Sequence, residues 1–222
     1  MGVLLLLLSM AGFFTAVVLL IAASLTKKAW LAKFTVGGVG VWLVFYAAML
    51  LGFSLTSTEK VLAAGEAKEY CGFYIDCHMH TTITGIRTAQ SIGDKQANGQ
   101  FYIVNVKVFS NARNPAIAFR LLESKARVFL ANGEKIARDT SAESLLATAN
   151  IDLGGDIKGS QKIKKEIVFD IPVGSAEPKL LITEGYGIDK VIERILVGDE
   201  DSLLHAQTFF ELKERNETAR VK

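Results

Sequence analysis

The stretch MGVLLLLLSMAGFFTAVVLLIAASLT, residues 1–26, decides the first part of the fold because it contains no charged residue. A second uncharged stretch, FTVGGVGVWLVFYAAMLLGFSLTST, covers residues 34–58. A helix needs roughly 20 consecutive apolar residues to cross a bilayer, and both stretches are longer. The sequence therefore predicts a transmembrane helical hairpin over residues 1–58, with a link at residues 27–33.

A cleaved signal peptide is the main alternative for residues 1–26. Such a peptide starts with basic residues and ends at a small-residue cleavage site. No Lys or Arg precedes the apolar stretch here. We therefore expect the first helix to stay in the protein.

The basic residues of the link predict the orientation of the hairpin. The link carries Lys27, Lys28 and Lys33, whereas the first stretch carries no basic residue. Positive charge marks the cytoplasmic side of a membrane protein. The sequence therefore predicts a two-pass protein of the plasma (inner) membrane, with its N-terminus and residues 59–222 on the extracytoplasmic side.

The net charge of +2 comes from the hairpin. Its link holds three of the 25 basic residues and no acidic residue, so residues 59–222 carry 22 basic and 23 acidic residues, a net charge of −1. The exterior part has no basic patch of the kind that binds nucleic acid. The lipid bilayer is the first expected partner, and nucleic acid is not expected.

Small residues recur four positions apart in both apolar stretches. They are Gly12, Ala16, Ala48, Gly52 and Thr56. Such faces allow close approach of helices in lipid, either between these two helices or with a partner. Neither stretch contains a charged residue or a His, which argues against an ion pathway. The hairpin is interpreted as an anchor and a docking surface.

The exterior part changes character along the chain. Residues 59–69 are expected to form a short helical stalk, residues 70–213 a folded domain and residues 214–222 a charged tail. Two segments of the domain show the period-two alternation of half-buried strands. The alternating apolar residues are Tyr102, Val104, Val106 and Val108 in the first and Ile163, Ile167, Phe169 and Ile171 in the second.

Further short elements complete the predicted domain. Asn132-Gly133 is typical of a tight hairpin turn. The segments KLLIT, KVIERILV and AQTFFEL are further strand candidates, and residues 141–149 are the one candidate helix. Several short strands with turns between them predict an all-β sandwich.

Residues 80–183 resemble bacterial immunoglobulin-like extracytoplasmic domains of unknown function. The resemblance rests on GQFYIVNVKVFSNARNPAIAF, LANGEKIARDT and IKGSQKIKKEIVFDIPVGSAEPKLLIT, in that order. It implies an immunoglobulin-like sandwich, and that family has no shared catalytic residues. We accordingly expect no enzyme activity and no cofactor.

The segment EYCGFYIDCHMH, residues 69–80, holds both cysteines and two of the three histidines. The spacing of Cys71 and Cys77 does not fit the C-x-x-C-H of covalent haem or the short C-x2-4-C of a zinc knuckle. Two close cysteines in an oxidising compartment are expected to pair as a disulfide, with free thiols as the remaining option.

A metal site is the alternative use of this segment. His78 and His80 alternate along one face of a strand, and His205 is a possible third ligand. Two N-terminal helices followed by a β domain resemble subunit II of cytochrome oxidase. That subunit holds copper through C-x3-C-x3-H-x2-M late in its domain, and this chain lacks the motif.

Two hypotheses follow for function. The first is a non-catalytic, membrane-anchored extracytoplasmic β-sandwich that serves as an accessory or assembly subunit of a larger membrane protein complex. The alternative is a metal-binding or electron-transfer subunit that uses residues 71–80.

Overall fold

The computed structural model of the protein describes residues 2–72, 76–114, 116–159, 161–185 and 187–213. The chain forms two compact units. One combines Met1–Glu59 with Gly187–Gln207, and the other combines Lys60–Tyr186 with Thr208–Lys222. Residues 187–207 thus belong with the helices, whereas the sequence placed them in one domain over residues 70–213. The expected tail, residues 214–222, lies outside the described residues.

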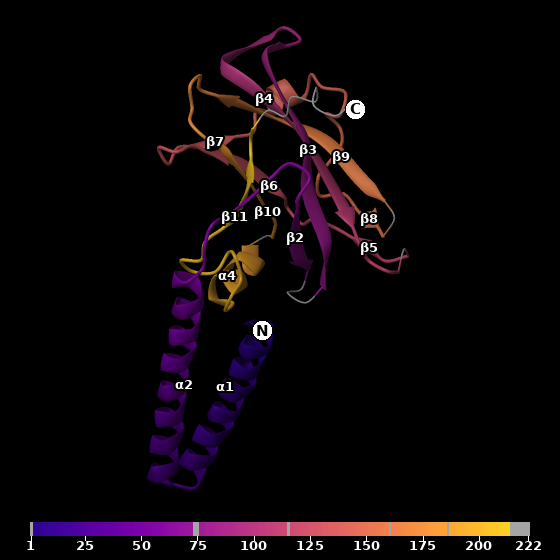
Figure 1. Cartoon of the computed structure of the whole chain (residues 1–222). Coiled ribbons are helices and arrows are strands. Elements are labelled where there is room, and N and C mark those ends of the chain that lie inside the picture. The colour runs from indigo at the N-terminus through magenta and orange to yellow at the C-terminus, as the bar shows by residue number, and fades with distance from the viewer. Residues whose placement is uncertain (1, 73–75, 115, 160, 186, 214–222) are drawn as a thin grey trace, which may run out of the picture. The chain divides into compact units, whose positions relative to one another are not determined.

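The first unit is built on a helical hairpin, labelled α1 and α2 in Figure 1. Helix α1 covers Gly2–Leu25 and α2 covers Ala29–Leu55. A tight turn joins them, and Lys27 adopts a positive φ of 53° there. Both helices are long and apolar enough to cross a membrane, because 24 and 27 residues span about 36 and 40 Å at 1.5 Å per residue.

Helix α1 buries a row of small residues that recurs every seven positions. The members are Gly2, Ser9, Ala16 and Ala23. Trp42 of α2 donates its indole N–H to the Ser9 hydroxyl at 3.0 Å. A seven-residue repeat keeps one seam of a helix against its neighbour, and small side chains let the two backbones approach.

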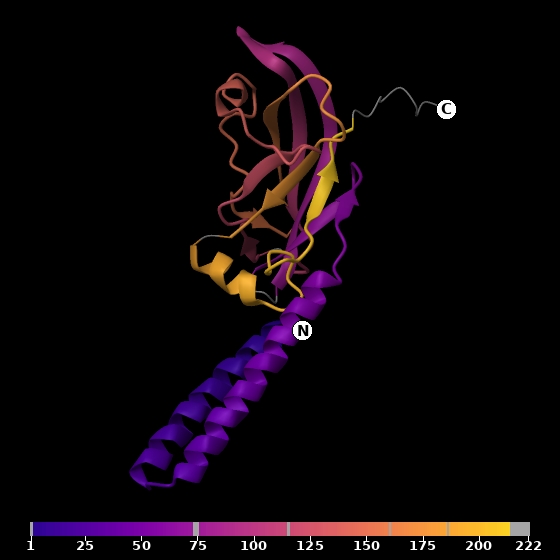
Figure 2. The same cartoon turned by 90° about the vertical axis from the view of Figure 1, so that its left-hand side faces the viewer.

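The second unit is a β-sandwich (Figure 2). One sheet has the strand order β1-β11-β10-β6-β7 and the other has the order β2-β3-β4-β9, with a small β5-β8 pair beside them. The strands of the first sheet are β1 (Lys60–Leu62), β6 (Lys125–Phe129), β7 (Lys135–Ala137), β10 (Lys179–Thr183) and β11 (Thr208–Glu211). The others are β2 (Ala67–Gly72), β3 (Asp76–Ile92), β4 (Lys95–Ser110), β5 (Ala118–Phe119), β8 (Ile157–Lys158) and β9 (Lys162–Ile171).

The alternation in the sequence builds the core between the two sheets. Val104, Val106 and Val108 of β4 are fully buried there, with Tyr102 partly buried beside them. Ile167, Phe169 and Ile171 of β9 join them, and Ile163 packs at the margin. Leu180 and Ile182 of β10 and Phe210 of β11 close the core from the other sheet. The predicted sandwich and these strand faces are confirmed.

The four-stranded sheet is also covered on its outer face. Phe101, Ile103 and Val168 pack there against Ala142. Ala142 belongs to α3, which covers only Thr140–Glu143. The helix expected over residues 141–149 is therefore a single turn, which Asp139 caps by accepting the N–H of Ala142 at 2.9 Å.

Two further expectations on secondary structure were wrong. Residues 59–69 form no helical stalk, because β1 pairs with β11 and Gly65 turns the chain with a φ of 97°. The segment KVIERILV is helical rather than a strand, and α4 covers Gly187–Ile195. Its apolar residues recur three and four positions apart, which is the period of a helix.

Candidate functional site

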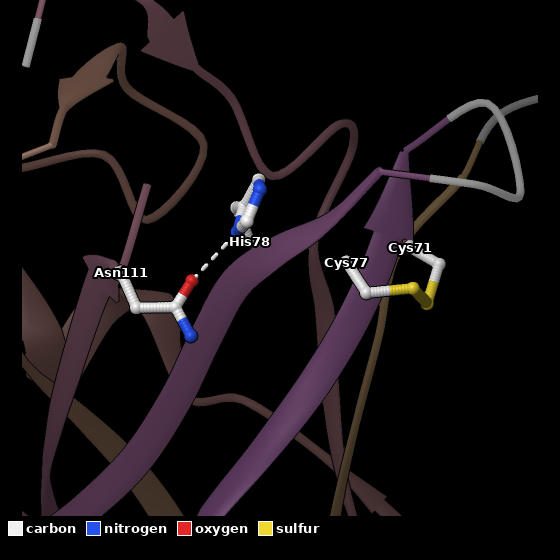
Figure 3. The surroundings of a disulfide bond; sticks show 4 residues. All are labelled: Cys71, Cys77, His78 and Asn111. Carbon is white, nitrogen blue, oxygen red and sulfur yellow. Dashed lines mark hydrogen bonds between the residues drawn. A yellow bond between two sulfur atoms is a disulfide. The ribbon is translucent and has the colours of Figure 1, made fainter. Parts of the chain in front are cut away.

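The two cysteines close the β2–β3 hairpin. Cys71 ends the regular part of β2, Cys77 lies near the start of β3, and the two sulfur atoms form a disulfide (Figure 3). Antiparallel pairing of Tyr70 with Met79 brings the strands together at this point. The expected disulfide is therefore present, and neither cysteine is a thiolate that could bind a metal.

The histidines of this segment are held by aromatic and amide neighbours. His78 points away from the disulfide in Figure 3, and its Nδ1 lies 2.8 Å from Oδ1 of Asn111. The His78 ring also meets Phe119 edge-on at 5.8 Å. His80 stacks on Phe109 with ring centroids 5.2 Å apart. These contacts are those of histidines that contribute to packing.

His205 belongs to the helical unit, whereas His78 and His80 belong to the sandwich unit. Its Nδ1 lies 2.8 Å from the carbonyl oxygen of Ala206. Among the described residues, no group of three or more His, Cys, Asp or Glu side chains could hold a metal ion. The alternative ligand set of His78, His80 and His205 thus gains no support from the described residues.

The small residues singled out in the helices divide between two environments. Ala16 is buried in the helix contact, whereas Ala48, Gly52 and Thr56 are exposed. A side-chain carbon added at Gly12 or Gly52 would meet nothing within 4 Å. The face made by Ala48, Gly52 and Thr56 therefore does not join the two helices. The sequence reasoning did not identify the seven-residue row, although the small residues Ser9 and Ala23 lie seven positions on either side of Ala16.

The segment 187–207, which we call the outer cap, closes the end of the hairpin opposite the basic link. Tyr46 donates its hydroxyl to the carbonyl oxygen of Ile195 at 2.7 Å. The hydroxyls of Ser54 and Ser202 lie 3.2 Å apart in a buried contact. Ser57 accepts the N–H of Ala206 at 2.8 Å. Sequence reasoning missed this cap because its partners are some 149 residues apart.

The start of α1 also packs against the outer cap. A side-chain carbon on Gly2 would lie 2.2 Å from the carbonyl oxygen of Val197, so only glycine fits at this contact. Leu196 and Val197 are buried. The outer cap thus contacts both helices through backbone and small side chains.

Carboxyl groups of the outer cap have raised pKa values. Burial, followed by the negative charges of Asp201 and Asp199, raises the pKa of Glu193 to about 7. Burial is also the main cause that raises the pKa of Asp199 to about 6, with Asp201 and Glu200 adding to it. Burial disfavours the charged form of a carboxyl group, and neighbouring negative charge adds to that effect.

A polar hollow of about 560 Å³ lies on the sandwich, and Lys95, Arg138, Asp139 and Asp170 are among its lining residues. Lys95 donates to both carboxylate oxygens of Asp139, at 2.6 and 2.7 Å. Burial alone would raise the pKa of Asp139, but bonds from Lys95, the Ala142 N–H and Ser141 outweigh it and lower the pKa.

The other charges around this hollow are paired as well. Arg138 forms a two-pronged pair with the buried Glu143, at 2.8 and 2.5 Å. Asp170 accepts the N–H groups of Asn98 and Gly99, at 2.8 and 2.9 Å. Each of these charged groups is therefore bonded to another group of the sandwich and stabilises its fold.

The two units define a class of protein: a β-sandwich joined to two N-terminal apolar helices. No protein family model matches the sequence. No curated protein matches it either.

Solved structures give weak similarities. The secreted protein MPT63 of Mycobacterium tuberculosis is 12% identical over 58% of this chain and 98% of its own, with a TM-score of 0.38. The YjhA protein from Bacillus subtilis is 13% identical over 68% and 98%, with a TM-score of 0.42. An uncharacterized β-sandwich protein from Clostridium difficile is 9% identical over 71% and 98%, with a TM-score of 0.36. The sandwich assignment therefore rests on the strand order of this chain, and the resemblance to cytochrome oxidase subunit II gains no support.

Proposed function

We propose that the protein is a membrane-anchored extracytoplasmic β-sandwich without catalytic activity, which serves as an accessory or assembly subunit of a larger membrane protein complex. In this proposal α1 and α2 cross the membrane and Lys27, Lys28 and Lys33 face the cytoplasm. The sandwich and the outer cap then lie on the extracytoplasmic side.

The attachment of the outer cap to both helices is the observation that carries this proposal. The cap is the connection between β10 and β11, two neighbouring strands of the sandwich. It binds α2 through Tyr46 and Ser54 and packs on Gly2 of α1. A cleaved signal sequence would have no use for the Gly2 contact, because its removal would strip the cap of its packing on α1. The contacts therefore support a retained anchor.

The chemistry of the described residues supports a non-catalytic role. The charges of Lys95, Arg138, Asp139 and Glu143 are matched to one another or to backbone groups. The cysteines are joined to each other and the histidines of the 71–80 segment are held by Asn111 and aromatic rings. Such groups stabilise a fold, whereas a catalytic group needs a free position beside a substrate.

A labelling experiment tests the anchor and its orientation. Because the native cysteines form a disulfide, a single added cysteine can be labelled without removing them. Val173→Cys on the sandwich should react with a membrane-impermeant maleimide on intact spheroplasts, and Lys28→Cys should react only after lysis. The intact mass of the purified protein should include residues 1–26. Reaction of Lys28→Cys in intact spheroplasts, or loss of residues 1–26, would contradict the proposal.

The subunit role is tested separately. Native membranes that hold the protein at its native expression level are solubilised in mild detergent, and the protein should migrate in an assembly larger than its monomer. Chemical crosslinking in the membrane should capture the same partner that this assembly contains. Migration as a free monomer in both experiments would refute the subunit role and leave the anchor untouched.

A further inference from the structure

Helix α4 of the outer cap exposes an apolar stripe on its surface. Its apolar stripe is made by Ile188, Val191 and Ile195. Ile188 is 66% exposed and Val191 is 64% exposed. On the opposite face Asp189, Lys190 and Glu193 are only partly exposed, whereas Arg194 is exposed. A surface helix in water turns its apolar stripe toward the core, so this stripe requires an apolar environment from outside the chain.

The turn that follows α4 also exposes apolar side chains. Leu203 and Leu204 are exposed, and Leu204 has a positive φ of 64°. A non-glycine residue in this left-handed region is uncommon and costs conformational energy. An exposed leucine in that conformation is thus unfavourable in water on two counts, and burial of its side chain in an apolar phase would offset both.

The contacts of the outer cap set its depth along the helices. Tyr46 lies nine residues before Leu55, the end of α2, which is about 14 Å along a helix. The carbonyl oxygen of Ile195 is bonded to Tyr46, whereas Ser202 meets Ser54 near the end of α2. The apolar core of a bilayer is about 30 Å thick, whereas α2 is about 40 Å long. Because α2 exceeds the hydrocarbon by about 10 Å and Tyr46 lies about 14 Å from the end of α2, the end of α4 lies inside the hydrocarbon of the outer leaflet, even if the whole excess projects outward.

We propose that the outer cap is embedded in the outer leaflet of the bilayer, with Ile188, Val191, Ile195, Leu203 and Leu204 against the lipid acyl chains near the headgroups. The apolar surface of the cap then continues the lipid-facing surface of α1 and α2, which favours lipid over a separate protein partner. This inference rests on the proposed membrane anchor. It adds a third contact with the membrane, made by the connection between two strands of the sandwich.

The net charge of the cap indicates which lipid headgroup it requires. Residues 187–207 hold five acidic residues and two basic residues, a net charge of −3 with His205 neutral. Interfacial helices that bind anionic lipid are rich in Lys and Arg. The cap therefore enters the leaflet by its apolar side chains, and a zwitterionic phosphatidylcholine bilayer is sufficient.

Fluorescence quenching in the full-length protein tests the inference. Single cysteines at Val191 and Leu204 carry an environment-sensitive fluorophore, and the protein is reconstituted in phosphatidylcholine vesicles. Nitroxide groups on the acyl chains near the headgroup should quench both positions as strongly as a probe at Val44, an exposed position on α2. Aqueous iodide should quench them weakly. Val173→Cys on the sandwich is the matched exposed apolar control, and it should show the opposite ratio.

Each of the other outcomes contradicts a stated part of the inference. Quenching of Val44 by lipid but of Val191 and Leu204 by iodide would overturn the embedded cap and leave the anchor in place. Failure of lipid quenching at Val44 as well would overturn the anchor itself. Protection of Val191 and Leu204 from both quenchers would assign the surface to a protein, contrary to the proposal. Replacing part of the phosphatidylcholine with phosphatidylglycerol should not increase lipid quenching, and an increase would contradict the role given to the charge.

Discussion

The hydroxyl of Tyr46, within the second apolar helix, donates a hydrogen bond of 2.7 Å to the backbone carbonyl oxygen of Ile195 at the end of α4. This bond joins residues 149 positions apart in the sequence. In the proposed membrane anchor, it ties the outer cap to the hairpin at a depth where a bare carbonyl has few water partners. A polar group in apolar surroundings is costly without a hydrogen bond, so the pairing fixes where the end of α4 lies.

Tyr46→Phe should loosen the outer cap while the sandwich stays folded. Loss of one hydrogen bond costs about 0.5–1.5 kcal/mol. We expect faster trypsin cleavage after Lys190 and Arg194 in reconstituted protein. Tyr102→Phe in β4 is the control, and it should leave that cleavage rate unchanged. An unchanged rate in Tyr46→Phe would show that the bond does not hold the cap.

Ala16→Leu should disrupt the contact between α1 and α2. Ala16 is buried in the seven-residue row, and overpacking a close contact costs about 1–3 kcal/mol. Gly12→Leu is the matched control, because its added side chain enters open space. Denaturing-detergent titration of the reconstituted protein should show a lower midpoint for Ala16→Leu alone. Equal midpoints for the two variants would refute the seven-residue seam.

Gly52→Leu tests whether the exposed small-residue face binds a partner. The added side chain meets nothing within 4 Å in this chain, so the hairpin and the sandwich should keep their unfolding midpoints. We expect the larger assembly seen on native gels to be lost, because a branched side chain blocks close helix approach. Gly40→Leu places the same side chain on another exposed face of α2 and should keep the assembly. Retention of the assembly in both variants would exclude this face.

Cys77→Ser should lower stability without changing the fold. The disulfide closes a short loop between residues six positions apart, and the loop-entropy model assigns about 2–3 kcal/mol to so short a loop. Reduction of the native protein should lower the unfolding midpoint by a similar amount, and it should add two hydrogens to the peptide that spans both cysteines. Equal midpoints for the oxidised and reduced proteins would show that the staple does not stabilise the domain.

The parts of the fold that local patterns determine could be predicted from the sequence. Uncharged stretches identified α1 and α2, and alternation around Val106 and Phe169 identified the faces of β4 and β9. Residues 59–69 were predicted to be helical because Ala, Glu and Lys favour helices. Pairing of Val61 with Phe209 of the distant β11 overrides that preference.

The candidate site was predicted less completely, for the same physical reason. Cys71 and Cys77 are close in sequence, so their disulfide could be inferred from proximity. The outer cap depends on contacts between α2 and a segment some 149 residues away, which no local pattern contains. Its apolar residues were assigned to a strand because KVIERILV is rich in β-branched side chains. The three-and-four spacing of Ile188, Val191 and Ile195 was the available signal for a helix.

The carboxyl groups of the outer cap predict that its stability depends on pH. Glu193 has its pKa raised from 4.5 to about 7, first by burial and then by Asp201 and Asp199, with Asp189 adding to the shift and Lys190 opposing it. The folded cap therefore binds the Glu193 proton more tightly than the unfolded cap does. By linkage, this contribution to stability is fully present below pH 4.5 and is lost as the pH rises to about 7. The pKa of Asp199, raised from 3.8 to about 6, acts in the same direction over a lower range.

Glu193→Gln separates this effect from other titrations, because the amide stays neutral at every pH. In the wild-type protein, hydrogen exchange of residues 187–207, corrected for its intrinsic pH dependence, should show decreasing protection between pH 4.5 and 7. Glu193→Gln should match the wild type at pH 4 and keep more protection than the wild type at pH 8, with the remaining loss due to Asp199. Glu211→Gln on the exposed side of β11 should follow the wild type throughout. If wild type and Glu193→Gln share one pH profile, Glu193 does not titrate between the two states of the cap. A profile in which protection of the wild type increases with pH would reverse the sign and would mean that the folded cap stabilises the carboxylate.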